Sequence, residues 1–165
     1  MLHGLQLLLG LLSAVWADSV GPGPGPSVWP KPSRSEAAGG GGAAAVSFTN
    51  ISFALTADSS DGVLRKAAAR YRGIILAQSA GLRVPAAVPG RGQGYQVTLQ
   101  VENTSVPLSP GQMKEAYKLD ATAAGCTISS QSVWGALRGL ETLAQLVEPA
   151  AAGFQLSPIV ISDTP

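Results

Sequence analysis

Apolar residues recur along this chain with two different periods, and each period predicts a type of element. Residues 46–56 (VSFTNISFALT) and 95–102 (YQVTLQVE) alternate apolar with polar positions, as strands buried on one face do. In the first segment the alternation changes phase at Asn50, which predicts a break or a bulge in the strand.

Three further segments have the pattern of strands. Residues 116–122 (AYKLDAT) and 126–131 (CTISSQ) resemble the two arms of a hairpin that turns around residues 123–125. SPIVISD (157–163) predicts a last, short strand near the end of the chain.

Two segments carry the helical period instead. The first is GVLRKAAARYRGIILAQ (62–78), whose predicted buried face consists of Leu64, Ala67, Tyr71, Ile74 and Ile75. Ser59, Ser60 and Asp61 offer N-cap oxygens for this helix, and Gly81 is a suitable stop.

The second helix is predicted over SVWGALRGLETLAQLV (132–147), with Ser130 or Ser132 as its N-cap. Its apolar residues in register are Val133, Leu137, Leu140, Ala144 and Val147. The predicted order is therefore strand, helix, two or three strands, helix, strand. This order favours an α+β fold in which two helices lie on one face of a mixed or antiparallel sheet.

The two ends of the chain have a different composition. Residues 1–17 combine the apolar run Leu5 to Leu12 with small residues before Ala17, which is typical of a secretory signal peptide. Residues 18–45 are rich in Gly, Pro, Ser and Ala and are predicted to be flexible, except that VWPKP (28–32) could dock Trp29 onto a folded domain. The folded domain is expected over residues 46–148, followed by a linker and strand over 149–165.

Charge and composition narrow the functional classes. The chain has 165 residues, of which 45% are hydrophobic and 13% charged, and its net charge is +1. One ordinary domain fits this length, and nucleic-acid binding is not expected without a clustered basic surface. After the leader, no segment has the roughly 20 apolar residues of a membrane anchor, so none is expected.

In a secreted chain three residues become candidates for modification or disulfide pairing. Asn50 (NIS) and Asn103 (NTS) both begin N-glycosylation sequons. Cys126 is the single cysteine, so it is either buried and inert or paired with a cysteine outside this chain. Its strand-like surroundings favour burial.

The residues provide no catalytic, cofactor-binding or metal-binding constellation. The single histidine, His3, lies in the leader, so the mature chain has no imidazole for acid–base catalysis. Asp58 and Asp61 lie near a helix start, where capping explains them, and GRGQG (90–94) lacks the spacing of a phosphate-binding loop.

Several segments together resemble a known family. VWGALRGLETLAQLV closely resembles a helix in the accessory N-terminal domain of eukaryotic β-hexosaminidases, glycoside hydrolase family 20. The order of the flanking segments also fits, from VWPKP through ARYRGII, EAYKLDAT and GCTISS to VISDTP. The resemblance covers residues 28–165 and implies a zincin-like accessory domain.

The resemblance also implies where the chemistry lies. In this family a (β/α)8 barrel follows the accessory domain and removes terminal β-linked N-acetylglucosamine or N-acetylgalactosamine from glycoconjugates. The 2-acetamido group of the substrate is the nucleophile, and an adjacent Asp-Glu pair assists it. That pair has no matching position in this chain, which ends about where the barrel begins. This chain alone is therefore expected to be non-catalytic and to be part of a longer, dimeric lysosomal enzyme that binds no cofactor.

Two questions stay open at this stage. Arg138 and Glu141 either pair with one another on a solvated helix face or, together with Trp134, meet the missing barrel. The chain is either a fragment of the enzyme or a short secreted binding or regulatory product, either lysosomal or extracellular. Lysosomal members carry a disulfide in this domain, and this chain lacks the second cysteine.

Overall fold

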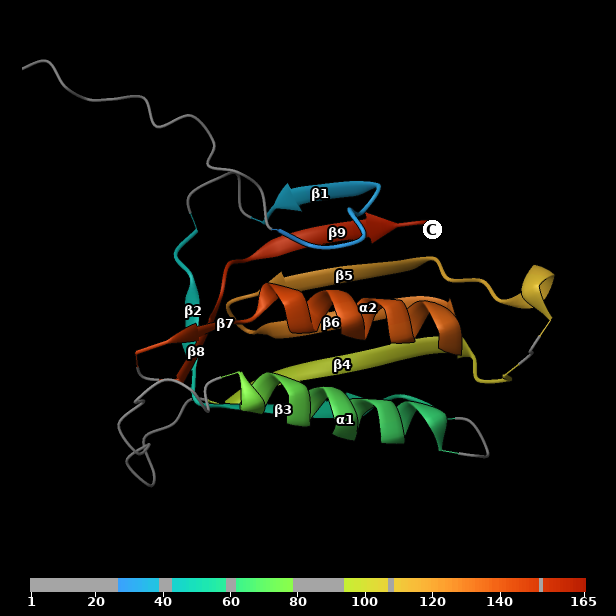
Figure 1. Cartoon of the computed structure of the whole chain (residues 1–165), viewed down its shortest axis with the longest axis horizontal. Helices are drawn as coiled ribbons and strands as arrows, with labels where there is room; N and C mark the ends of the chain where they lie inside the picture. Colours follow the sequence, from blue (N-terminus) through green and yellow to red (C-terminus); the bar gives the residue numbers. More distant parts are fainter. Residues whose placement is uncertain (1–26, 39–42, 59–61, 79–93, 107–108, 152) are drawn as a thin grey trace, which may run out of the picture.

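The computed structural model describes residues 27–38, 43–58, 62–78, 94–106, 109–151 and 153–165 (Figure 1). The predicted signal peptide, residues 18–26 and 39–42, the cap candidates Ser59 to Asp61 and the predicted stop Gly81 lie outside these residues. The described part contains two helices and two sheets, so the α+β prediction is confirmed.

A mixed six-stranded sheet forms the centre of the fold, with strand order β1-β9-β5-β6-β4-β3. Its strands are β1 (Arg34–Ala37), β3 (Asn50–Leu55), β4 (Gly94–Asn103), β5 (Tyr117–Thr122), β6 (Gly125–Ser132) and β9 (Ile159–Asp163). β4 pairs in parallel with β3 and β6, and the other pairs are antiparallel. The predicted hairpin is confirmed, since β5 and β6 are neighbours joined by two residues.

Both helices lie on the same side of this sheet (Figure 1). α1 (Val63–Ala77) packs on β3, and α2 (Val133–Leu146) packs on β5 and β6 and against α1. Along β4, Tyr95, Val97, Leu99 and Val101 point into this layer and are buried, whereas the alternate positions face the opposite, polar side. The period of two along this strand therefore determines which face the helices cover.

The ends of the two helices differ from each other in how they are capped. α2 begins as predicted, because the Ser132 hydroxyl accepts a hydrogen bond from the Gly135 N–H at 3.4 Å. The N-cap of α1 is Gly62, whose φ of 64° suits glycine, whereas the predicted cap candidates lie outside the described residues. Asp58 supplies the missing acceptor from upstream, since its Oδ1 accepts from the Leu64 N–H at 3.1 Å. Its predicted capping role is confirmed.

On the predicted buried face of α1, Ala67 and Tyr71 are half-buried and one residue is exposed. The fully buried side chains of this helix include Leu64 and Ile75, but Ile74 is 39% exposed. A step of 100° per residue carries Ile74 past the edge of the stripe that touches the sheet. The prediction that Ile74 is buried is therefore wrong, and its side chain forms part of the outer surface of the helix layer.

A second, three-stranded sheet crosses one end of the molecule and was not predicted. It contains β2 (Val46–Phe48), β8 (Gly153–Leu156) and β7 (Glu148–Ala150), in that order. The predicted break near Asn50 is confirmed, and it is the point at which the chain passes from β2 to β3 in the other sheet. The predicted linker after residue 148 is wrong up to Leu156, because Phe154 and Leu156 are buried in the main core.

Residues 27–38 of the Gly- and Pro-rich segment are also more ordered than predicted. Within it, Arg34–Ala37 forms β1 on the edge of the main sheet, paired with β9. Val28 is 7% exposed and belongs to the core, whereas Trp29 is 81% exposed. VWPKP therefore does dock onto the domain, but through Val28 rather than through the predicted Trp29.

A short 3₁₀ helix, η1 (Pro110–Gln112), precedes β5. No helix in the described ranges is long and apolar enough to cross a membrane.

Candidate functional site

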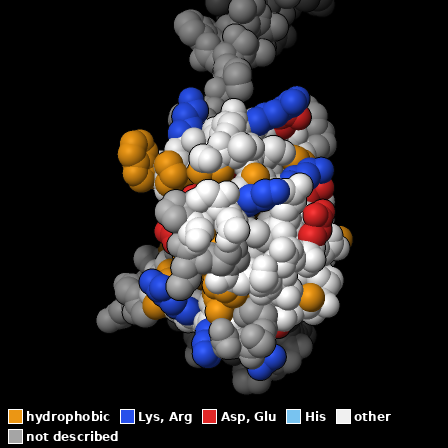
Figure 2. Space-filling model, turned by 90° about the vertical axis from the view of Figure 1, so that its right-hand side faces the viewer, with side chains coloured by type: hydrophobic (Ala, Val, Ile, Leu, Met, Phe, Trp, Pro, Cys, Tyr) orange, Lys and Arg blue, Asp and Glu red, His pale blue; other side chains and the backbone are white. Residues whose placement is uncertain are grey.

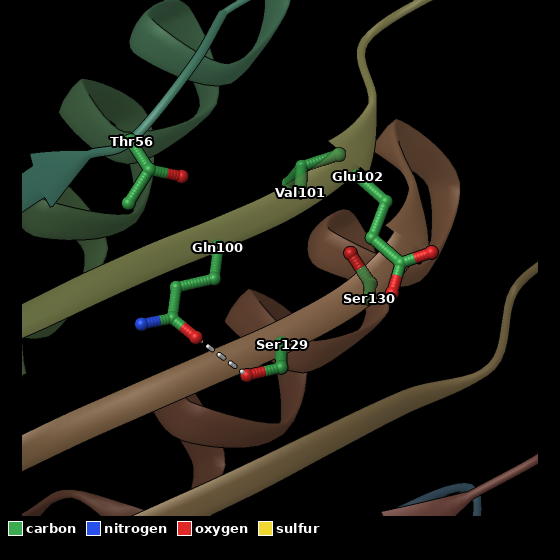
Figure 3. Close-up of a pocket in the computed structure, with 6 residues that line it drawn as sticks. All are labelled: Thr56, Gln100, Val101, Glu102, Ser129 and Ser130. Atoms are coloured by element: carbon green, nitrogen blue, oxygen red, sulfur yellow. Dashed lines mark hydrogen bonds between the residues drawn. The ribbon is translucent and has the colours of Figure 1, made fainter.

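The described residues offer little material for catalysis. They contain no group of three or more His, Cys, Asp or Glu side chains placed to hold a metal ion. A hollow on the polar side of the sheet is lined by Thr56, Gln100, Val101, Glu102, Ser129 and Ser130 (Figure 3). In it, the Ser129 hydroxyl donates to Gln100 Oε1 at 3.2 Å, and Glu102 is the one titratable lining residue. A lone carboxylate beside hydroxyls lacks the second group that acid–base catalysis needs.

The outward side of α2 is the better candidate. Trp134, Arg138, Glu141 and Gln145 recur on it at intervals of three or four residues, opposite the face that packs on the sheet. Arg138 and Glu141 are exposed, and Trp134 and Gln145 are half-buried. This stripe carries all three residues that were predicted to meet another domain.

Arg138 and Glu141 do not form the pair with one another that was one of the predicted alternatives. Arg138 binds Glu115 through two hydrogen bonds, from Nε to Oε2 at 3.0 Å and from Nη2 to Oε1 at 3.2 Å. Glu141 accepts a hydrogen bond from the Tyr71 hydroxyl of α1 at 2.5 Å. Each charge on α2 is thus held by a residue outside α2, Glu115 in the segment before β5 and Tyr71 on α1.

Tyr71 stays neutral over the physiological range. Partial burial raises its pKa to about 12, and the hydrogen bond to Glu141 and the charge of that carboxylate act in the same direction. The Arg70 guanidinium carbon lies 5.9 Å from the centre of the Tyr71 ring and, with Arg138, opposes the shift. A neutral phenol keeps its proton for Glu141, so this contact between the helices persists at neutral pH.

Trp29 joins the same side of the molecule through α2. The Gln145 side chain accepts from the Trp29 N–H at 2.7 Å and donates to the Trp29 carbonyl at 2.9 Å. The backbone at Trp29 is therefore fixed while its indole remains in solvent. We use "helix surface" for Trp29, Tyr71, Ile74, Trp134, Arg138 and Glu141.

The helix surface holds both large hydrophobic side chains that are exposed in the described part of the chain, Trp29 and Ile74. Helical periodicity alone could have placed Gln145 on the same stripe of α2 as Arg138. Glu115 and Tyr71 were missed because their contacts with α2 join positions 23 and 70 residues apart. No local pattern in the sequence predicts such contacts.

Charged side chains do not form one continuous basic area on the face shown in Figure 2. Lys and Arg side chains lie apart from one another there, with Asp and Glu side chains and uncharged surface between them.

Cys126 is 3% exposed, as predicted. Burial raises the pKa of its thiol from 9.0 to about 12, and the nearby Asp120 adds to the shift. We expect Ellman's reagent to leave the native chain unmodified at pH 8 and to label one thiol in urea, because the thiolate is the reactive form. Rapid labelling of the native chain would contradict the burial of β6.

The same thiol makes stability depend on pH. Its pKa is higher in the folded chain, so its contribution is complete below pH 9 and is lost as the pH rises toward 12. The free energy of unfolding should fall over that interval, and Cys126→Ala should reduce the fall. Urea titrations at a series of pH values measure this.

A profile of the family described as "beta-acetyl hexosaminidase like" matches residues 28–146. The chain belongs to this family. The resemblance noted from the helix motif and its flanking segments is thereby confirmed.

Individual relatives agree with this assignment. The human β-hexosaminidase subunit β is 34% identical over 115 residues, which cover 67% of this chain and 20% of the human protein. The rat subunit α is 48% identical over 52 residues, covering 31% of this chain and 10% of the rat protein. The chain thus spans a fifth or less of the length of these relatives.

Solved structures share the fold. The chitobiase of Flavobacterium johnsoniae has a TM-score of 0.59 at 22% identity, covering 81% of this chain and 20% of that one. An exo-β-N-acetylglucosaminidase of Vibrio harveyi has a TM-score of 0.51 at 18% identity, covering 84% of this chain and 19% of that one.

Proposed function

We propose that this chain is the N-terminal supporting domain of a β-N-acetylhexosaminidase. The whole enzyme would remove terminal non-reducing β-linked N-acetylglucosamine or N-acetylgalactosamine from glycoconjugates in a retaining, substrate-assisted reaction. The observation that carries this proposal is the family match over residues 28–146 in a chain that spans a fifth or less of its relatives. The reaction itself belongs to a (β/α)8 barrel outside these residues.

The role of this domain in the enzyme is to support that barrel through the helix surface. Exposed Trp and Ile side chains beside paired charges have the composition of an interface, in which aromatic residues and Arg are enriched. The Arg138–Glu115 and Tyr71–Glu141 contacts hold the charged groups in place before docking, so little side-chain entropy is lost when the barrel binds. We further propose that the enzyme enters the secretory pathway, acts in the lysosome and forms a dimer.

The first experiment is to measure the size of the native protein. An immunoblot of deglycosylated tissue extract, with an antibody against residues 115–147, should show a band about five times larger than this chain. Immunoprecipitates should hydrolyse a chromogenic β-N-acetylglucosaminide, and the recombinant 165-residue chain should not. A band at the size of this chain alone, without activity in the precipitate, would replace the proposal with a short, non-enzymatic secreted product.

A second experiment tests the helix surface. In the chain alone, Arg138→Ala should change the free energy of unfolding by less than about 1 kcal/mol, since the pair with Glu115 is partly solvated. In the longer polypeptide the same substitution should cost at least about 1 kcal/mol more, because docking removes the pair from water. Thermal unfolding of both forms measures the difference.

The Arg34–Glu36 pair provides the matched control for this test. It lies on β1, outside the helix surface, and its side chains are 73% and 59% exposed. Arg34→Ala should have the same small effect in the chain alone and in the longer polypeptide. If Arg138→Ala lowered the free energy of unfolding equally in the chain alone and in the longer polypeptide, the barrel would not dock on the helix surface.

A further inference from the structure

The two sequons of this chain have different structures. Asn103 is the last residue of β4, and Thr104 and Ser105 follow it as exposed or half-buried loop. Asn103 Oδ1 accepts hydrogen bonds from both the N–H and the hydroxyl of Ser105, at 2.9 and 2.7 Å. This is an Asx turn closed by the sequon's own hydroxyl, and it needs no contact outside three consecutive residues.

The turn prepares the Asn103 amide for substitution at nitrogen. Oδ1 is occupied by two donors, whereas no hydrogen bond within the described ranges engages Nδ2. When an amide nitrogen loses a proton, the negative charge gathers on the oxygen. Donors at that oxygen therefore make the Nδ2 proton more acidic, which increases the fraction of the amide whose nitrogen is deprotonated and nucleophilic.

The sequon that begins at Asn50 lies within a strand. Residues 50–52 pair in parallel with Gly94, Tyr95 and Gln96 of β4, and Ile51 is fully buried. Bending this tripeptide into the same turn would break the pairing of the strands and withdraw Ile51 from the core. Its extended conformation in the fold is thus incompatible with the geometry that Asn103 adopts.

The Asn50 side chain has a structural role instead. Its Oδ1 accepts from the Ile51 N–H at 3.0 Å within the strand and from Arg72 Nη2 at 3.0 Å, while Arg72 Nε donates to the Ile51 carbonyl at 3.0 Å. The two hydrogen bonds donated by Arg72 connect the outer side of α1 to the start of β3. The planar guanidinium group of arginine is suited to donate to two acceptors at once in this way.

We propose that Asn103 carries an N-linked oligosaccharide and that Asn50 stays unmodified. In the transfer, Asn103 Nδ2 forms a bond to the anomeric carbon of a lipid-diphosphate-linked oligosaccharide. The bond between that carbon and the diphosphate oxygen breaks, the lipid diphosphate leaves, and a base of the transferase takes the Nδ2 proton. This proposal rests on entry into the secretory pathway, which is part of the proposed function.

The test separates glycosylation of Asn103 from the proposed entry into the secretory pathway, because a foreign leader peptide directs the chain into that pathway. Residues 18–165 are secreted from human cells behind a leader taken from another secreted protein, in parallel with the native chain. Glycan occupancy is measured as the mass lost on treatment with peptide N-glycosidase in heavy-oxygen water, which marks the modified asparagine. If only the native leader fails to deliver protein, the secretory part of the proposed function falls and the glycan proposal stands on the other form.

Four variants identify the site. Asn103→Gln should abolish the mass loss, and so should Ser105→Ala, which keeps the asparagine and removes only the hydroxyl. Thr104→Ala keeps the sequon and should behave like the parent chain, as should Asn50→Gln. A glycan that persists in Asn103→Gln, a glycan lost in Asn50→Gln, a parent chain with two glycans, or one with none would each overturn the proposal.

Discussion

Replacing Gly135 with alanine should lower the free energy of unfolding by about 2–3 kcal/mol, although alanine is the better helix former. A Cβ at this position would collide with the carbonyl oxygen of Ala116 and come within 2.9 Å of the Ser130 Cβ. The carbonyl belongs to the backbone leading into β5, so it cannot move aside without shifting the strand. Urea titration of the chain and the variant measures the loss.

Gly73 provides the control within the same protein. It lies inside α1, and a Cβ there would meet nothing within 4 Å. Gly73→Ala should therefore stabilise the chain by about 0.5–1 kcal/mol through helix propensity alone. If Gly135→Ala were also stabilising, the close approach of α2 to the sheet would be contradicted.

The close approach also explains the motif that identifies the family. A Cβ on Gly139 would lie 2.5 Å from Ile128 Cγ2 and 3.3 Å from Tyr117 Cδ2. The two glycines of W-G-A-L-R-G thus lie four residues apart on the face of α2 that touches β5 and β6. The motif sets the depth at which the helix lies on the sheet, which is a packing role rather than a catalytic one.

The long elements could be predicted because their periods repeat over enough residues. β4 alternates over ten residues and α2 keeps one apolar face over fourteen, so each pattern distinguishes strand from helix. β1, β7 and β8 have four residues or fewer, and β7 contains Pro149. Segments this short take their conformation from the strand beside them, which no local pattern records.

The candidate site was predictable to the same extent. The sequence placed Arg138 and Glu141 near each other on the helix and named Trp134 with them as residues that could meet the barrel, and the structure has all three on one outward stripe of α2. Spacing could not show that Arg138 binds Glu115 or that Gln145 holds the backbone of Trp29, because those partners lie outside α2 and far from it in the sequence. The prediction also chose Trp29, the largest apolar residue of VWPKP, as the one that docks, whereas the smaller Val28 is the one buried in the core.

Asp163 holds the beginning and the end of the described chain together, and replacing it should have the second large effect. Its Oδ1 accepts hydrogen bonds from the Ser33 N–H at 2.9 Å, the Ser33 hydroxyl at 2.6 Å and the Thr164 N–H at 3.0 Å. Asp163 is 8% exposed, and Asp163→Ala removes the acceptor shared by these donors, leaving the Thr164 N–H with only Ser33 Oγ at 3.2 Å. We expect a loss of about 1–3 kcal/mol in the free energy of unfolding.

Asp163→Asn separates the hydrogen bonds from the charge. The amide oxygen can accept the same bonds, but without the charge that makes bonds to a carboxylate roughly twice as strong, so the loss should be about half as large. Hydrogen exchange of residues 33–37 supplies the local measurement, since β1 should lose protection in Asp163→Ala before β4 does. If protection of β1 were unchanged in Asp163→Ala, the pairing with β9 alone would hold the segment, and its order would owe nothing to this carboxylate.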